Sequence, residues 1–80
     1  MSADTPQPDE TVDARGATCP GPLMDLVGAL RSAETGTVVA LLSDTEQSTS
    51  DVPEWADESG NEVLAVEDEG EYYRILVAKA

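Results

Sequence analysis

DARGATCPGP, residues 13–22, joins a short strand pattern to an amphipathic helix pattern and contains the only cysteine of the chain, Cys19. A thiol at a helix N-terminus faces unpaired backbone N–H groups and the positive end of the helix dipole, and both favour the thiolate. The chain has no second cysteine and no histidine, which excludes an intramolecular disulfide, a Cys–His pair and an imidazole metal ligand. The segment therefore predicts one reactive sulfur atom at the start of a helix.

The residues that flank this segment predict a strand before it and a helix after it. Residues 11–14 alternate as a short strand does, and residues 20–33 repeat apolar side chains at helical spacing. The apolar stripe of this helix consists of Leu23, Leu26, Val27 and Leu30. Pro20 and Pro22 fit the first turn, where a missing N–H breaks no helical bond. Gly28 lies inside the helix, and we expect it to allow close packing on the sheet.

A second helix is predicted to begin after Asp51, an N-cap followed by a glutamate three residues later. Pro53 fits the first turn of this helix, and Gly60 ends it. We expect the tryptophan of this helix, Trp55, to lie in the core together with Met24 and the leucines.

The remaining strand patterns complete the fold. Residues 37–42 form an apolar run typical of a central strand, and residues 63–66 and 72–78 form a hairpin. The order is β-α-β-α-β-β, and right-handed crossovers place both helices on one face of a four-stranded mixed sheet. This predicts a two-layer α/β sandwich, a single domain over residues 11–80 that follows a disordered tail at residues 1–10.

The charge of the chain is strongly acidic, with 17 Asp and Glu against 4 Lys and Arg and a formal net charge of −13. Such a surface repels phosphate backbones, so we expect no direct nucleic-acid binding. No apolar run is long enough for a membrane span and no signal peptide is visible, so a cytoplasmic location is expected. The acidic residues are spread along the chain, which favours adaptation to a high-salt cytoplasm in a halophile over a surface for a basic partner.

Carboxylate pairs such as Glu67 and Glu69 lack the spacing of a calcium loop, so we expect no metal site. The adjacent Tyr72 and Tyr73 place one ring on the outer face of the sheet, where it either contacts a partner or lies in solvent.

A candidate site follows from the expected sheet. The carboxyl ends of parallel strands meet at one edge, which brings the loop before Cys19 near Asp44. Arg15 is the nearest cation in the sequence, and two roles stay open for it: support of the thiolate or of an anionic donor, or a surface salt bridge with Asp13. Asp44 is interpreted as a turn or capping residue of its loop, and Gly16 as a residue with positive φ.

The motif resembles that of the TusA/SirA-type sulfur-carrier family, in which Cys-Pro-x-Pro follows a short first strand. The residues that carry the resemblance are Asp13, Arg15, Gly16, Cys19, Pro20 and Pro22. The resemblance covers about residues 12–79 and includes Asp44 and the entry to the second helix, Asp51-Val52-Pro53.

The resemblance implies a persulfide carrier that needs no cofactor. Cys19 would accept a sulfane sulfur from a cysteine desulfurase or a rhodanese-type donor and pass it to a cysteine of another protein. Pro20 and Pro22 would set the geometry of the motif, and Arg15 would support the thiolate. The carrier would serve tRNA thiolation, cofactor assembly or sulfur metabolism.

Two alternatives from other classes remain for this sequence. The chain could be a regulatory or interaction module, or Cys19 could sense oxidants without transferring sulfur. A thiol redox enzyme is less favoured because the usual Cys-x-x-Cys pair is absent from the sequence.

Overall fold

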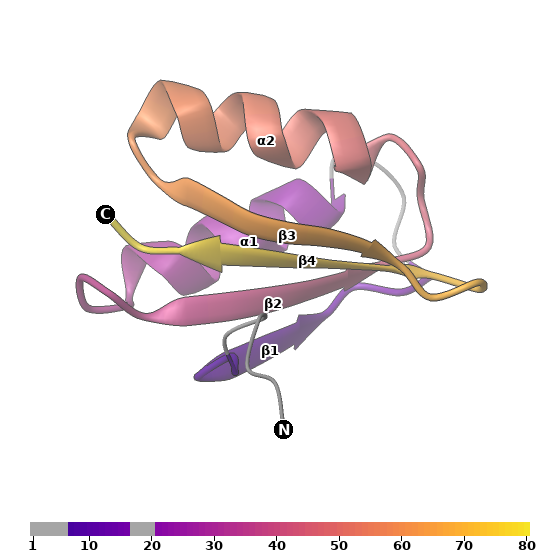
Figure 1. Cartoon of the computed structure of the whole chain (residues 1–80), viewed down its shortest axis with the longest axis horizontal. Helices are drawn as coiled ribbons and strands as arrows, with labels where there is room; N and C mark the ends of the chain where they lie inside the picture. The colour runs from indigo at the N-terminus through magenta and orange to yellow at the C-terminus, as the bar shows by residue number, and fades with distance from the viewer. Residues whose placement is uncertain (1–6, 17–20) are drawn as a thin grey trace.

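The computed structural model describes residues 7–16 and 21–80, and Pro22 is described by its backbone alone. These residues form one sheet and two helices (Figure 1). The elements are β1 (Glu10–Asp13), α1 (Gly21–Arg31), β2 (Val38–Ser43), α2 (Ser48–Ser59), β3 (Glu62–Asp68) and β4 (Tyr73–Ala78). The expected β-α-β-α-β-β order is confirmed.

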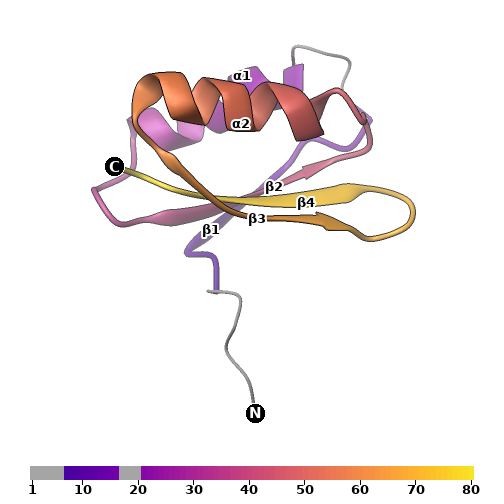
Figure 2. The same ribbon diagram turned by 45° about the horizontal axis from the view of Figure 1, so that its top comes forward.

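The four strands form a mixed sheet in the order β1-β2-β4-β3. β1 pairs with β2 in parallel, and β4 runs antiparallel to both of its neighbours, β2 and β3. Figure 2 shows α1 and α2 on the same side of this sheet. α1 packs mainly over β1 and β2, and α2 over β3 and β4. The predicted two-layer α/β sandwich is therefore confirmed.

The core lies between the helices and the inner face of the sheet. Its buried members are Ala14, Leu26, Leu30, Val39, Leu41, Val52, Ile75 and Val77. Side chains alternate between the two faces of a strand, so every second residue of β2 and β4 reaches the helices. Burial of a side chain of this size removes apolar surface from water and stabilises the folded state by about 1.5–3 kcal/mol.

Met24 is not in the core, contrary to the expectation from the sequence. Its side chain is 58% exposed. Leu26 and Leu30 define the buried face of α1, and at 100° per residue Met24 lies on a different face of the helix. Trp55 does pack against the core, where it is partly buried.

α2 begins at Ser48, three residues before the expected N-cap Asp51. The residue before the helix, Gln47, has helical backbone angles, and its side chain makes no capping hydrogen bond. A buried hydrogen bond of 2.8 Å joins the hydroxyls of Ser43 and Ser48 and ties the start of α2 to the end of β2. Residues 48–50, which precede the expected N-cap, therefore belong to the first turn of the helix.

The earlier start changes the position of Pro53, which lies beyond the first turn and not within it. Proline has no N–H to donate to the carbonyl of Thr49, four residues before it. At its other end the helix stops as predicted, at Gly60, which has the left-handed conformation with φ 84°.

The other boundaries differ from the expected ones by up to two residues. β1 begins at Glu10, and Asp9 exchanges two hydrogen bonds with Val38: its N–H donates to the Val38 carbonyl and its carboxylate accepts the Val38 N–H. The sequence predicts that Asp9 and Glu10 belong to the tail. Residues 1–6 of that tail lie outside the described residues. β3 extends to Asp68 and contains an irregularity between Val63 and Ala65.

Within the described residues, neither helix is long and apolar enough to cross a membrane.

Gly28 does not serve close packing, contrary to expectation. It lies on the exposed side of α1, and a Cβ added there would meet no atom within 4 Å. Glycine in a helix interior therefore weakens α1 with no packing benefit in return.

We predict that Gly28→Ala stabilises the protein by about 0.5–1 kcal/mol, because alanine loses less backbone freedom on folding and has room for its methyl group. Urea unfolding in high salt measures this difference. Gly16→Ala serves as the control and should destabilise, since Gly16 has φ +89°. A loss of stability in Gly28→Ala would contradict the open space around this residue.

Candidate functional site

Three connections meet at one edge of the sheet. The parallel strands β1 and β2 both end there, as expected, and the Ala14 N–H donates to the Leu42 carbonyl at 2.9 Å just beyond β1. β4 begins at the same edge, where Tyr73 pairs with Ser43, so the β3–β4 turn lies beside the other two connections (Figure 1).

Asp13 and Arg15 form a two-pronged ion pair at this edge. The Arg15 Nε–H donates to Asp13 Oδ1 at 2.9 Å, and its Nη2–H donates to Oδ2 at 2.8 Å. The Arg15 backbone N–H also donates to Oδ1, at 3.1 Å. Both side chains are about half exposed, so the pair organises the connection more than it stabilises the fold. The salt bridge considered for Arg15 is present.

The Arg15 guanidinium also lies over the ring of Tyr72, 5.0 Å from its centroid. This distance suits a cation–π interaction. The contact joins the connection after β1 to the turn before β4. β1 and β4 lie on opposite sides of β2. The sequence does not predict this partner of Arg15. Arg15 and Tyr72 lie far apart in the chain, and only the folded sheet brings them together.

Asp44 joins the connection after β1 to the one after β2. Its Oδ2 accepts the backbone N–H of Gly16 at 2.8 Å. Gly16 has φ +89°, in the left-handed region expected for it. Asp44 is interpreted from the sequence as a turn or capping residue of its own loop, but the N–H that it binds belongs to the neighbouring connection.

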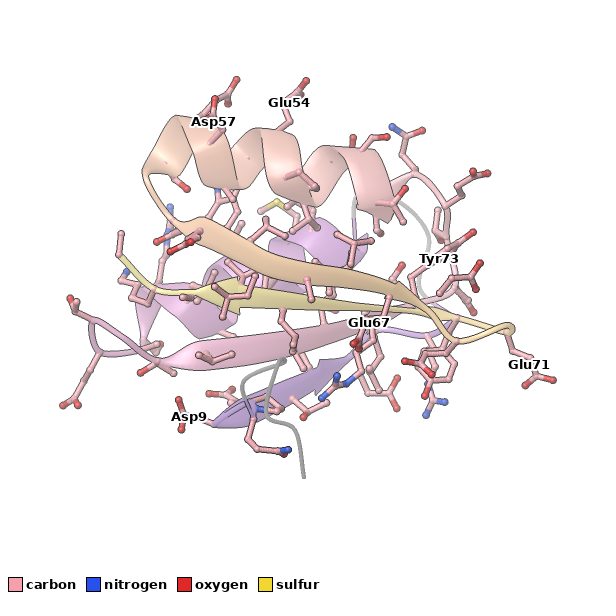
Figure 3. The ribbon with its side chains drawn as sticks, in the orientation of Figure 1. Asp9, Glu54, Asp57, Glu67, Glu71 and Tyr73 are labelled. Carbon is pink, nitrogen blue, oxygen red and sulfur yellow. The ribbon has the colours of Figure 1, made fainter. Side chains whose placement is uncertain are left out.

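An open groove of about 530 Å³ lies between these side chains, lined by Asp13, Arg15, Asp44, Glu71 and Tyr72. Figure 3 shows Glu71 pointing outward at the tip of the β3–β4 turn. Three carboxylates and one guanidinium leave the groove with a formal charge of −2. Residues 7–16 and 21–80 contain no group of His, Cys, Asp and Glu side chains arranged to hold a metal ion.

The predicted site residues are only partly described. Arg15 lies at the sheet edge as expected, and Pro22 is the second residue of α1, within its first turn. Cys19 and Pro20 lie outside the described residues. The described chain stops at Gly16 and resumes at Gly21, the first residue of α1, so the connection that contains Cys19 begins and ends at defined points.

Comparison with known proteins agrees with the motif. The family described as "Sulfurtransferase TusA" matches residues 10–79. A putative sulfur carrier protein of Archaeoglobus fulgidus is 48% identical over 68 residues, which cover 85% of this chain and 93% of that protein. An uncharacterized protein of Methanocaldococcus jannaschii is 39% identical over 72 residues, covering 89% of this chain and 26% of that protein.

A solved structure is similar in fold. It is the SirA-like protein from Desulfitobacterium hafniense, with a TM-score of 0.75 and 27% sequence identity. The match covers 86% of this chain and 95% of that chain.

We predict that Asp13 titrates far below an ordinary aspartate. Hydrogen bonds from the Arg15 side chain and then from its backbone lower the pKa of Asp13 from 3.8 to about 2. Because this pKa is lower in the folded state, the contribution of the pair to stability is present above about pH 4 and is lost as the pH falls toward 2. Carbon-13 NMR titration of the Asp13 carboxyl group measures the pKa directly.

Arg15→Ala should raise the pKa of Asp13 toward 3.8, because the side-chain donors are lost. Tyr72→Phe is the matched control, since it keeps the ring beneath Arg15 and leaves the ion pair intact. An Asp13 pKa that stays low in Arg15→Ala would show that the ion pair is not its cause.

Proposed function

Because this chain belongs to the TusA sulfurtransferase family, we propose that it is a sulfur carrier that accepts and donates a persulfide sulfur on Cys19. The observation that carries the proposal is the family match over residues 10–79 together with the Cys-Pro-x-Pro motif that it contains. Cys19 belongs to the short connection between Gly16 and α1, which leaves the edge where the two parallel strands end. Loops at such an edge hold the reactive groups in many α/β proteins.

The proposed transfer is a thiol–persulfide exchange. The Cys19 thiolate attacks the terminal sulfur of a donor persulfide, a new S–S bond forms to Cys19, and the donor S–S bond breaks to release the donor cysteine as a thiolate. The acceptor thiolate then attacks the terminal sulfur on Cys19 in the same way. Both steps conserve electrons, so no external oxidant or reductant enters.

A carrier of this kind benefits from a single cysteine. A second thiol in the same chain could attack the inner sulfur of the persulfide, form a disulfide and expel the cargo as sulfide. The sequence contains no other cysteine that could do this. The sulfur on Cys19 is therefore lost only to another molecule.

We assign supporting roles to three further residues of the motif. Arg15, held by Asp13 and by the Tyr72 ring, is the cation nearest to Cys19 in the sequence and favours the thiolate or an anionic donor. Pro20 and Pro22 restrict the backbone on either side of Gly21, where α1 begins.

The proposed donor is a cysteine desulfurase or a rhodanese-type protein, and the acceptor is a thiol of another protein. The pathways that this transfer could serve are tRNA thiolation, cofactor assembly and sulfur metabolism. The open groove beside Arg15 accords with contact between proteins rather than with enclosure of a small substrate.

The distribution of charge supports a cytoplasmic protein adapted to high salt. Figure 3 shows carboxylates at well-separated places, with Glu54 and Asp57 on the outer side of α2 and Asp9 before β1. A spread of this kind keeps the surface solvated in concentrated salt.

The test is the intact mass of the protein, in high salt, after incubation with a cysteine desulfurase and cysteine. We expect one added sulfur atom, which dithiothreitol removes because a persulfide is reducible. Cys19→Ser is the control and should gain no mass while keeping the free energy of unfolding of the parent.

Absence of added sulfur with both desulfurase and rhodanese-type donors would contradict the proposal and favour a regulatory or interaction module. Addition of oxygen to Cys19 by dilute peroxide, without sulfur uptake from any donor, would instead favour a redox sensor.

A further inference from the structure

We propose that Asp44 is a positioning residue for sulfur transfer, which acts by fixing the backbone from which the Cys19 connection departs. This inference rests on the proposed function and assigns a role to a residue outside the Cys-Pro-x-Pro motif. It is carried by the hydrogen bond between the Asp44 carboxylate and the Gly16 N–H.

The hydrogen bond of Asp44 lies just beyond the pairing of β1 with β2. The last backbone hydrogen bond between these two segments is donated by the Ala14 N–H to the Leu42 carbonyl. Two residues further along each segment, the Gly16 N–H meets Asp44, but its acceptor is the side-chain Oδ2 and not a carbonyl. The carboxylate thus extends the pairing by one bond, at a residue whose positive φ departs from strand geometry.

Two successive N–H groups are held by carboxylates at this point. Asp13 accepts the N–H of Arg15, and Asp44 accepts the N–H of Gly16. Asp13 lies on the same segment as Arg15, so its bond moves with that segment. Asp44 directly follows β2, an inner strand of the sheet, so its hydrogen bond ties the connection after β1 to the sheet.

The other end of the Cys19 connection is fixed by packing. α1 begins at Gly21, and its buried Leu26 and Leu30 hold the helix on the sheet. Residues 17–20 therefore join two anchored ends. Loss of the Asp44 bond would release one of them, and a thiol displaced by about 1 Å can react on the order of 10²-fold more slowly in a step that requires alignment.

The charge of Asp44 and its hydrogen bond to Gly16 can be tested separately. A negative charge does not favour a thiolate, so removal of the Asp44 charge alone is not expected to slow transfer. Loss of the hydrogen bond is expected to slow it. A variant that loses the charge but keeps an acceptor for the Gly16 N–H therefore distinguishes the two effects.

The experiment compares three substitutions of Asp44 in the full chain. Asp44→Asn keeps a side-chain oxygen that can accept the Gly16 N–H but loses the charge. Asp44→Ala loses both, and Asp44→Glu keeps the charge but moves the oxygens outward by one methylene. Glu54→Gln is the control for loss of one carboxylate, because Glu54 lies on the outer side of α2, away from this edge.

The first measurement is the rate at which Cys19 takes sulfur from a persulfidated cysteine desulfurase. The second is the rate of alkylation by iodoacetamide across pH, which reports the thiol without any partner. We expect transfer to Asp44→Ala to be about 10- to 100-fold slower than to the parent, as for a misaligned nucleophile, with Asp44→Glu also slowed. Asp44→Asn should transfer at least as fast as the parent, and Glu54→Gln at the parental rate.

Equal slowing of the Asn and Ala variants, or a parental rate in Asp44→Ala, would overturn the proposal. Unfolding in urea confirms that each variant is folded, and if Asp44→Ala is not, the comparison of Asp44→Glu with Asp44→Asn decides the same question. Should the parent itself take up no sulfur, the proposed function fails separately. The alkylation rates then decide the positioning role, which needs the Ala and Asn variants to differ.

Discussion

The parallel pairing of β1 with β2 is the constraint on which the arrangement of the edge depends. It makes both strands end at the same side, so that Gly16 comes within hydrogen-bond distance of Asp44. The antiparallel pairing of β4 with β2 then brings Tyr72 to the same side, beneath Arg15. One strand, β2, therefore aligns every group of the candidate site that the structure describes.

Much of the fold could be predicted because its determinants are local. The helical spacing that includes Leu26 and Leu30 and the apolar run of β2 identify core elements directly. The start of α2 could not be predicted in this way, because it depends on a buried hydroxyl pair between Ser43 and Ser48 that only the folded chain creates. A capping pattern at Asp51 is a local signal that this tertiary contact overrides.

The candidate site also has one part that the sequence predicts and another that depends on the fold. The pairing of Asp13 with Arg15 involves residues two apart, so the sequence alone could raise it. The partners of Arg15 and Gly16 from the other connections depend on strand order and register, which no short motif encodes. The sequence suggests that Asp44 caps its own loop, whereas the N–H that it binds belongs to the connection after β1.

The two outer strands of the sheet have a consequence for association between copies of the chain. An outer strand exposes backbone groups that can pair with a strand of another molecule and begin aggregation. Here β1 carries Glu10 and Asp13, and β3 carries Glu62, Glu67 and Asp68 together with an irregularity in its pairing. Edge-to-edge addition of a second molecule would bring carboxylates against carboxylates across a bent strand. Acidic side chains on the two outer strands thus disfavour growth of the open sheet into a fibre.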